Sequence, residues 1–563
     1  MKENIYRKLL KEYCDGLISL QITKKDKAFR GGFLCRACKM IHGRSPDAVY
    51  PLAVMYKLTG EGKYLEAADL CFDYGENLLC KDGALYNDAQ AGWRYTTVFH
   101  NIAVLETLRS LGERLPENMR KKFAVRSDGM TRWLYENLDE NSPPNINYVT
   151  TNALSLELAG LEFCEEKYRE RAAHLAEYAL RHFSENGLFY GESKNHDAVS
   201  PLGCRAVDIG YDLEESVPAL VKYAKAAGNE KMLAFLSEQL RKMTEFILPD
   251  GGLDNSFGCR NNKWTYYGSR TSDGISPAYL LLADRDPVFA EAAYRNTRLQ
   301  QQCTADGLLC GGPDYRKHGE YPCTHHTFEH ANAIAFAVDC IPEKYLVSQG
   351  VELPSERSDF YRYYPEVNTF KFTRGNYSAT ITGYDFDVPF SGHASGGTLS
   401  MLYGKNVGPM IAASVTDYVL VEPTNMQQPL DIEHHRSLVP RLEAERDGEK
   451  YASSRFVLPE MTAEVAEGHV RIKVETGLSA RDGKSLSVKP RVEYTLDAAG
   501  MRVAVSGMEG MKFVLPLISG RVCIQKGSLV KKEQIFFLTG GFIAEEYIIA
   551  PDRTGETEFT VKE

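Results

Sequence analysis

The sequence predicts an α+β multidomain protein in which an N-terminal (α/α) toroid of about six helical hairpins precedes a C-terminal antiparallel β-sandwich. Two observations favour this fold class. A similar glycine-containing turn recurs four times in the first 310 residues, each time after an amphipathic stretch. After Pro342, short alternating runs typical of strands replace the long amphipathic ones. We therefore expect a toroid domain at residues 1–345 and a sandwich domain at residues 346–563.

The recurring turns all contain Asp-Gly or Asn-Gly followed by apolar residues. They are Asp82-Gly83-Ala84-Leu85-Tyr86, Asn186-Gly187-Leu188-Phe189-Tyr190, Asp250-Gly251-Gly252-Leu253-Asp254 and Asp306-Gly307-Leu308-Leu309-Cys310. Asx-Gly favours a turn because glycine tolerates positive φ and the Asx side chain can bond the nearby backbone. Units of roughly 40–60 residues with a turn at a fixed place indicate stacked helical hairpins. A closed ring of such hairpins gathers equivalent loops at one mouth, where we expect the chemistry.

Apolar residues at helical spacing predict the individual helices. The N-terminal segment 1–21 is interrupted by charges, so it is interpreted as an amphipathic helix and not as a signal peptide. The other expected helices are Ala48–Thr59, Tyr64–Leu79, Thr97–Leu111, Asn152–Phe163, Tyr168–Phe183, Glu214–Ala227, Lys231–Leu248, Ser276–Ala283, Val288–Leu299 and Thr327–Cys340.

Short β-type runs with Gly, Asp and Pro turns between them predict the antiparallel sandwich. They are Thr369–Thr373, Ser378–Tyr384, Gly397–Tyr403, Met410–Val415, Tyr418–Val421, Phe456–Leu458, Val470–Glu475, Val492–Leu496, Val503–Ser506, Phe513–Leu517 and Phe536–Thr539.

Composition excludes several classes of function. The net charge of −10, without a basic cluster, argues against nucleic-acid binding. No stretch approaches the roughly 20 apolar residues that a membrane-spanning helix needs. Thirteen scattered cysteines suit a reducing compartment, so we expect a cytoplasmic protein. The single CxxC motif, Cys35-Arg36-Ala37-Cys38, is interpreted as structural. The oligomeric state is not constrained.

Three polar motifs lie beside expected helices and strands: Asn145-Ile146-Asn147-Tyr148, Gly210-Tyr211-Asp212 and the glycine-rich segment 391–397, which contains His393. With the toroid-plus-sandwich order, they make the chain resemble the heparinase II/III-like and alginate-lyase-like polysaccharide lyases. The resemblance covers essentially the whole chain. It differs from the family pattern at Tyr148, where those families often have His, and in the segment 410–413, which lacks the carboxylate that helps hold a sandwich metal in some members.

The resemblance implies β-elimination on oligo- or polysaccharides that contain uronic acid, so the expected partner is an acidic oligosaccharide. This reaction needs donors that neutralise the uronate carboxylate, together with a base and an acid. Our catalytic candidates are Asn147, Tyr211, His326 and His393. The structural alternatives are a helix cap for Asn147 and a buried aromatic for Tyr211.

The segment 254–274 is too polar for a core, yet it carries four large aromatic residues and three cations. Sugars stack on aromatic faces, and arginine grips carboxylates with a bidentate fork. A second tryptophan lies in a similar motif, Gly92-Trp93-Arg94-Tyr95. The substrate-binding candidates are Trp93, Arg94, Asn255, Trp264, Tyr267, Arg270 and His325.

The segment from His326 to His330 spells HxxEH, an inverted zinc motif. No separate third ligand is evident in the sequence, so we predict no cofactor; a structural or catalytic divalent metal stays as the alternative.

Carboxylates support a second hypothesis, a uronidase-like glycoside hydrolase of the same architecture. Asp212 and Glu215 are three residues apart at an expected helix start, and Asp254 follows in the next loop. Such residues serve as an acid/base pair when two carboxyl groups flank the bond, although acidic residues also favour helix N-termini for electrostatic reasons. A non-catalytic glycan-binding protein is the third hypothesis.

Overall fold

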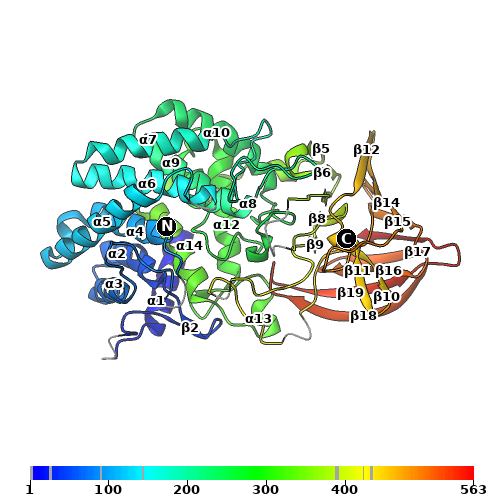
Figure 1. Cartoon of the computed structure of the whole chain (residues 1–563), viewed down its shortest axis with the longest axis horizontal. Coiled ribbons are helices and arrows are strands. Elements are labelled where there is room, and N and C mark those ends of the chain that lie inside the picture. Colours follow the sequence, from blue (N-terminus) through cyan, green and yellow to red (C-terminus); the bar gives the residue numbers. More distant parts are fainter. Residues whose placement is uncertain are drawn as a thin grey trace.

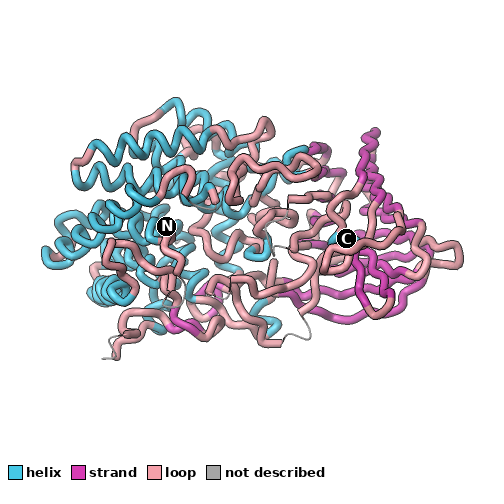
Figure 2. The backbone as a smooth tube through the Cα atoms, in the orientation of Figure 1, coloured by secondary structure: helices cyan, strands magenta, loops and turns pink. Residues whose placement is uncertain are grey.

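A computed structural model describes residues 4–24, 28–88, 92–142, 145–386, 392–422, 424–431 and 435–563. Helices gather at one end of the molecule and strands at the other (Figure 1). The same view coloured by secondary structure shows long loops between the two parts (Figure 2). Among the described residues, no helix has both the length and the apolar character needed to cross a membrane. Ser391, the first residue of the glycine-rich motif, lies outside the described residues.

Six helices of the described chain form a closed inner ring. Each contacts the next in order, and the last returns to the first. They are α2 (Val49–Thr59), α4 (Thr97–Leu111), α6 (Ile146–Phe163), α9 (Val217–Ala226), α11 (Ser276–Leu281) and α14 (Thr324–Cys340). These helices are apolar on several faces because other helices surround them, as the twelve buried residues of α4 show.

An outer layer of helices covers this ring, and each outer helix packs mainly on one inner helix. The outer helices are α1 (Ile5–Leu20), α3 (Gly62–Tyr74), α5 (Glu117–Asn137), α7 (Glu166–Leu180), α10 (Glu230–Met243) and α12 (Pro287–Gln302). The N-terminal helix α1 packs on the last inner helix, α14, and so completes the sixth pair. The predicted (α/α) toroid is therefore confirmed, with α5 as a helix that we did not predict.

All four recurring turns connect an outer helix to the next inner helix, so the inner helices enter the ring from the same end. Gly83, Gly187, Gly251 and Gly307 have φ values of 99°, 86°, 94° and 74°. A Cβ on Gly251 would come within 2.3 Å of the Arg295 backbone, so this turn needs glycine for its conformation and for space.

The C-terminal part contains three antiparallel sheets. The first has the order β5 (Asp359–Tyr364), β6 (Thr369–Arg374), β7 (Tyr377–Thr382), β8 (Thr398–Gly404) and β9 (Gly408–Ala412). The second has the order β12 (Glu460–Ala466), β13 (His469–Glu475), β14 (Arg491–Asp497), β15 (Gly500–Ser506), β20 (Thr557–Lys562) and β17 (Arg521–Lys526). The third has the order β11 (Glu449–Ala452), β10 (Arg441–Arg446), β16 (Met511–Leu517), β19 (Phe542–Ala550) and β18 (Ser528–Phe537).

The first sheet attaches the sandwich to the toroid. Every residue of β6, β7 and β8 is buried, which requires cover on both faces of the sheet. Met401 and Tyr403 join the apolar core of the toroid, whereas Phe370 and Phe372 join the core of the sandwich. The rest of the sandwich is thereby held at the mouth of the helical ring.

Two of the strand predictions were wrong. The segments 418–421 and 456–458 are loops; Val457 and Leu458 are 40% and 50% exposed, so their apolar character does not reflect burial in a sheet. Conversely, the edge strand β12 was not predicted because it pairs only with β13 and is largely exposed, which removes the alternation that marks a strand.

Candidate active site

A cavity of about 390 Å³ opens where the inner helices begin, between the toroid and the sandwich domain. We call it the mouth cavity. It is lined by Arg44, Asn87, Trp93, Thr96, Phe99, Asn145, Asn147, Tyr148, Tyr211, Glu215, Arg260, Lys263, Thr271, Glu422, Thr424 and Asn425. Helix N-termini carry partial positive charge, so this end of the ring favours an anionic ligand. Asn147, Tyr211, Glu215 and Trp93 are the predicted site residues that the fold brings together here.

Asn147 and Glu215 form a buried pair in the cavity wall. Asn145 occupies the N-cap position of α6, which leaves Asn147 in the first turn of that helix. Glu215 lies on a π-helical turn, Asp212–Ser216, directly before α9. The side-chain amide of Asn147 donates a hydrogen bond of 2.6 Å to a carboxyl oxygen of Glu215. Two hairpins separated by 68 residues thus present one amide and one carboxyl group together.

The carboxyl group of Glu215 is held in its neutral form near pH 7. Burial raises the pKa of Glu215 to about 8; Arg44 and the Asn147 hydrogen bond oppose this shift, and Asp273 and Glu192 add to it. A protonated carboxyl group is a hydrogen-bond donor, so it can face a substrate carboxylate without repelling it.

Tyr211 lies beside two cations. It is on the short helix α8 (Ile209–Tyr211), whose start is fixed by the Asp208 side chain accepting from the Tyr211 backbone N–H. The Tyr211 hydroxyl contacts the hydroxyl of Thr271 and accepts a hydrogen bond of 3.2 Å from the Lys263 ammonium. The Arg260 guanidinium lies 3.8 Å from the centre of the Tyr211 ring. Two positive charges therefore lie next to the Tyr211 side chain.

The cations of the cavity are balanced by carboxylates from elsewhere in the chain. Arg260 pairs with Glu192 at 2.9 Å, and Lys263 pairs with Glu422 of the sandwich-domain loop at 2.5 Å. Burial opposes the ionisation of Glu422, but Lys263 and Arg260 outweigh it and hold the pKa of Glu422 at about 2. The lysine that contacts Tyr211 is therefore fixed by an ion pair between the two domains.

Arg44 enters the cavity from the other side. It pairs with Asp47 at 2.9 Å and with Glu329 of α14 at 2.8 Å. It also donates a hydrogen bond of 3.2 Å to the Thr271 carbonyl, next to Tyr211.

An aromatic wall flanks the Asn147–Glu215 pair. The Trp93 indole N–H donates to the Tyr148 hydroxyl at 3.0 Å, and the two rings meet edge-on. Burial raises the pKa of Tyr148, so its phenol stays protonated. Arg94 lies at the protein surface instead, where it pairs with Asp82 at 2.7 Å.

Two substrate-binding candidates of the segment 254–274 lie at the contact between the domains. Arg270 donates to the Tyr315 hydroxyl at 2.9 Å and to the Leu538 carbonyl at 2.6 Å. The Trp264 indole donates to the Leu253 carbonyl at 3.0 Å. Both side chains are buried by contacts within the chain.

Asn255 and Tyr267 also make contacts within the protein. Asn255 accepts from the Ile209 backbone N–H at 2.9 Å and donates to Asp208 at 3.1 Å, which positions the helix that carries Tyr211. The Tyr267 ring meets the His330 ring edge-on, with centroids 5.0 Å apart.

The other two carboxylates of the hydrolase hypothesis are buried among protein groups. Asp254 binds Lys371 and Thr380 of the sandwich, each at 2.6 Å. Burial raises the pKa of Asp212 well above its usual value. Neither carboxylate oxygen of Asp212 has a hydrogen-bond partner among the described residues.

The predicted histidines lie in three surroundings. The His325 imidazole lies 3.4 Å from Glu329 and packs on the His42 ring. His326 is buried in the first turns of α14, where burial and Arg270 lower its pKa well below the usual range. His393 forms a β-bridge with Val415, and its imidazole Nε2 lies 3.0 Å from the Tyr384 carbonyl.

Several cavity residues were not selected from the sequence. Arg260 and Lys263 lie in the segment 254–274, whose three cations were a usable signal. Arg44 and Glu422 carry no such signal, because one lies in an ordinary turn and the other in a loop 378 residues later. Only the folded chain brings them together.

Two groups of side chains have the composition of a metal site among the described residues. Cys35, Cys38, His42 and Cys323 form the first, and His318, Glu320 and His435 the second. In the HxxEH segment, His330 Nδ1 lies 2.9 Å from the His326 carbonyl, and its Nε2 lies 3.4 Å from Glu214.

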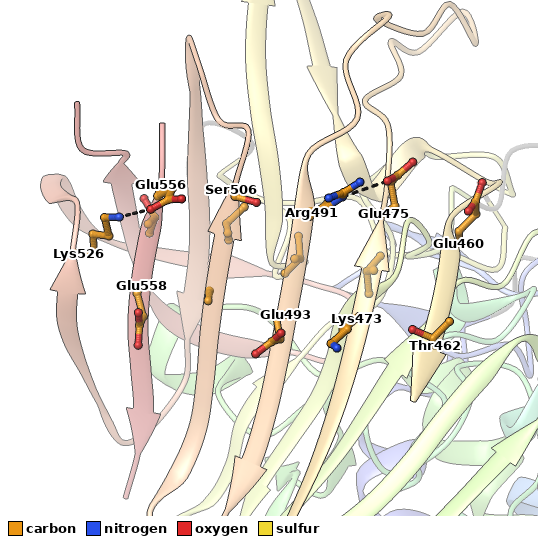
Figure 3. A pocket seen from close by; sticks show the side chains of 15 residues that line it. Glu460, Thr462, Lys473, Glu475, Arg491, Glu493, Ser506, Lys526, Glu556 and Glu558 are labelled. Atoms are coloured by element: carbon orange, nitrogen blue, oxygen red, sulfur yellow. Dashed lines mark hydrogen bonds and ion pairs between the residues drawn. The ribbon is translucent and has the colours of Figure 1, made fainter. Parts of the chain in front are cut away.

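A further hollow of about 570 Å³ lies on the second sheet, away from these groups (Figure 3). Its charged side chains bind one another, as the pairs Lys526–Glu556 and Arg491–Glu475 show. This face is interpreted as a solvated sheet surface.

Comparisons with known proteins agree with this architecture. The family model "Ulvan lyase N-terminal domain" matches residues 10–356, and "Ulvan lyase C-terminal domain" matches residues 361–538. The chain is 33% identical over 534 residues to a broad-specificity ulvan lyase of Formosa agariphila. This match covers 92% of this chain and 83% of the relative. The crystal structure of heparinase III matches with a TM-score of 0.59 and 11% identity, over 99% of this chain and 84% of that one. A chondroitin AC lyase of Streptomyces coelicolor A3 matches with a TM-score of 0.53 and 10% identity, over 100% and 79%. These two structures share the fold, and the family models and the curated relative show that the chain belongs to the ulvan lyase family.

Proposed function

We propose that the protein is a polysaccharide lyase that cleaves an acidic polysaccharide by β-elimination in the mouth cavity, with ulvan as the substrate to test first. Family membership supports the reaction class. The observation that carries the site assignment is the Asn147–Glu215 pair, which lines the same cavity as Tyr211.

The first requirement of the reaction is to neutralise the uronate carboxylate, because removal of the neighbouring proton moves negative charge onto it. Asn147 and the protonated Glu215 supply two hydrogen-bond donors without a competing negative charge. Arg44 adds positive charge to the same cavity.

The second requirement is a proton carrier, and we assign this role to Tyr211. The step requires the deprotonated oxygen of Tyr211 to take the proton next to the carboxylate, and Lys263 and Arg260 place positive charge beside this side chain. The electron pair of that C–H bond forms the carbon–carbon double bond as the glycosidic C–O bond breaks. The same phenol then returns the proton to the leaving oxygen. Trp93 and Tyr148 provide aromatic surface for a sugar ring.

The glycoside hydrolase hypothesis is not favoured. It needs two carboxyl groups facing one bond with room for water. Asp212 and Asp254 are buried among protein groups, and the neutral Glu215 is bonded to Asn147.

Incubation with ulvan tests the proposal, because only elimination creates a conjugated double bond that absorbs ultraviolet light. We expect absorbance to rise as the chains shorten. Shortened chains without that absorbance would contradict the lyase reaction. An unchanged rate of absorbance increase after Tyr211→Phe would contradict the site.

A further inference from the structure

Three cysteines and one histidine from opposite ends of the toroid sequence meet next to the mouth cavity. Cys35 and Cys38 belong to the small hairpin of β1 (Leu34–Cys35) and β2 (Met40–Ile41), and His42 follows it directly. Cys323 is the N-cap of α14, the last inner helix. One ligand atom from each of the four lies within 4.8 Å of the others. We propose that these four side chains bind a structural zinc ion.

The spacing of the ligand atoms fits a tetrahedral site. Zn–S bonds of about 2.3 Å at tetrahedral angles place two sulfurs about 3.8 Å apart, and a sulfur and a nitrogen about 3.6 Å apart. The Cys323 sulfur lies 3.6 Å from that of Cys35 and 3.5 Å from that of Cys38. It lies 4.0 Å from Nε2 of His42. A disulfide would need a separation of about 2.05 Å and would leave the third sulfur without a partner.

The groups around the cluster prepare these atoms as ligands. The Cys38 backbone N–H points at the Cys35 sulfur at 3.4 Å, an arrangement that stabilises a thiolate. The other ring nitrogen of His42, Nδ1, lies 3.1 Å from the Thr424 carbonyl and so carries the proton. This leaves the lone pair of Nε2 facing the sulfurs, as in metal-bound histidines whose second nitrogen donates to a carbonyl.

The ligand set selects the kind of metal and its role. Thiolates with one imidazole suit zinc, and four protein ligands without an open position are typical of structural sites. Cys35, His42 and Cys323 are buried, whereas Cys38 is partly exposed.

A metal here would join segments that are 288 residues apart in the chain. It would tie the first hairpin to the last inner helix and so reinforce the closure of the ring. Arg44, two residues after His42, binds Glu329 on α14 and lines the mouth cavity. The ion would therefore hold the segment that carries Arg44 in place beside the proposed active site, without contacting substrate itself.

The test measures metal in the full-length protein, purified without chelators from cells grown with zinc. Elemental analysis of the wild type is expected to give one zinc per chain. Cys38→Ser and Cys323→Ser are expected to lose that zinc. Cys164→Ser and Cys340→Ser, which change exposed cysteines outside the cluster, are expected to keep it. His42→Cys retains four suitable ligands and is expected to keep zinc as well.

Two measurements on the wild type keep the proposal testable if a ligand variant does not fold. Cobalt in place of zinc should produce the visible bands of a tetrahedral thiolate site. Alkylation in denaturant with a chelator should label all thirteen cysteines. Wild-type protein without zinc after incubation with Zn²⁺ and desalting would overturn the proposal. So would the loss of two labelled cysteines to a disulfide. Neither result depends on lyase activity, so each is separate from a failure of the proposed function.

Discussion

Replacing Glu215 by glutamine tests the central feature of the proposed site. Glutamine keeps the size and a hydrogen-bond donor but cannot ionise. If Glu215 acts as a neutral donor, Glu215→Gln should retain substantial activity at pH 7. If Glu215 acts instead as a general base or a nucleophile, the same change should abolish activity at every pH.

The magnitude follows from the pKa. Burial moves the pKa of Glu215 from 4.5 to about 8, and about 3.5 pK units correspond to roughly 5 kcal/mol at 1.36 kcal/mol per unit. Because the folded pKa is raised, the folded state binds the proton more tightly than the unfolded state does. Below pH 4.5 the Glu215 carboxyl group is protonated in both states, so the raised pKa does not change the free energy of unfolding. As pH rises towards about 8, the raised pKa lowers the free energy of unfolding progressively. Glu215→Gln should remove this cost and stabilise the folded protein most above pH 8.

The assay is the initial rate of ultraviolet absorbance on ulvan from pH 6 to pH 10, with an enzyme-free blank for base-catalysed elimination. Above about pH 8, kcat/KM of the wild type should fall about tenfold per pH unit as Glu215 ionises. The variant should lack this alkaline limb. Glu106→Gln is the matched control, because Glu106 is also a largely buried glutamate with a raised pKa but pairs with Lys222 outside the mouth cavity.

Two results would refute the reasoning. One is a folded Glu215→Gln protein without activity at any pH. The other is an alkaline limb that stays the same in the variant and in the wild type.

Three further predictions concern other residues. Tyr211→Phe should lower kcat by about 10²–10⁴-fold with little change in thermal unfolding. Tyr178→Phe, outside the cavity, should leave kcat unchanged, and equal effects of the two changes on kcat would contradict the role of Tyr211. Asp254→Ala should destabilise the protein by about 3–5 kcal/mol in urea unfolding, because Lys371 is left buried without its partner; lost activity with unchanged stability would favour a catalytic Asp254. Lys263→Met should lower kcat/KM by about 10–100-fold through the lost hydrogen bond to the phenol, and wild-type kinetics would exclude it from the site.

Local signals in the sequence were enough for the toroid. Gly83, Gly187, Gly251 and Gly307 mark turns whose conformation depends on adjacent residues, and helical periodicity marks the segments between them. The helix α5 was missed because its outward face is rich in charge and it carries Gly129 in its interior. The strand β12 was missed because it lies exposed at an edge.

The site could be predicted only in part. Asn147 and Tyr211 were selected because each lies in a short polar motif that carries the family resemblance, and the structure places both in the wall of the mouth cavity. Arg270 was placed with the substrate because its segment is polar and aromatic, yet the side chain joins the two domains. A segment buried between two domains and a segment that lines a cavity can have the same composition, so the sequence does not distinguish them.

The chain alone determined most of the helices and the order of a toroid before a sandwich, because turn preference and apolar periodicity act between residues close in sequence. Only the tertiary structure decided that Arg44 and Glu422 belong to one cavity, that burial raises the pKa of Glu215, and that Cys323 meets Cys35 and Cys38. These properties depend on burial and on charges that distant segments contribute. The interactions form only once the helical ring has closed.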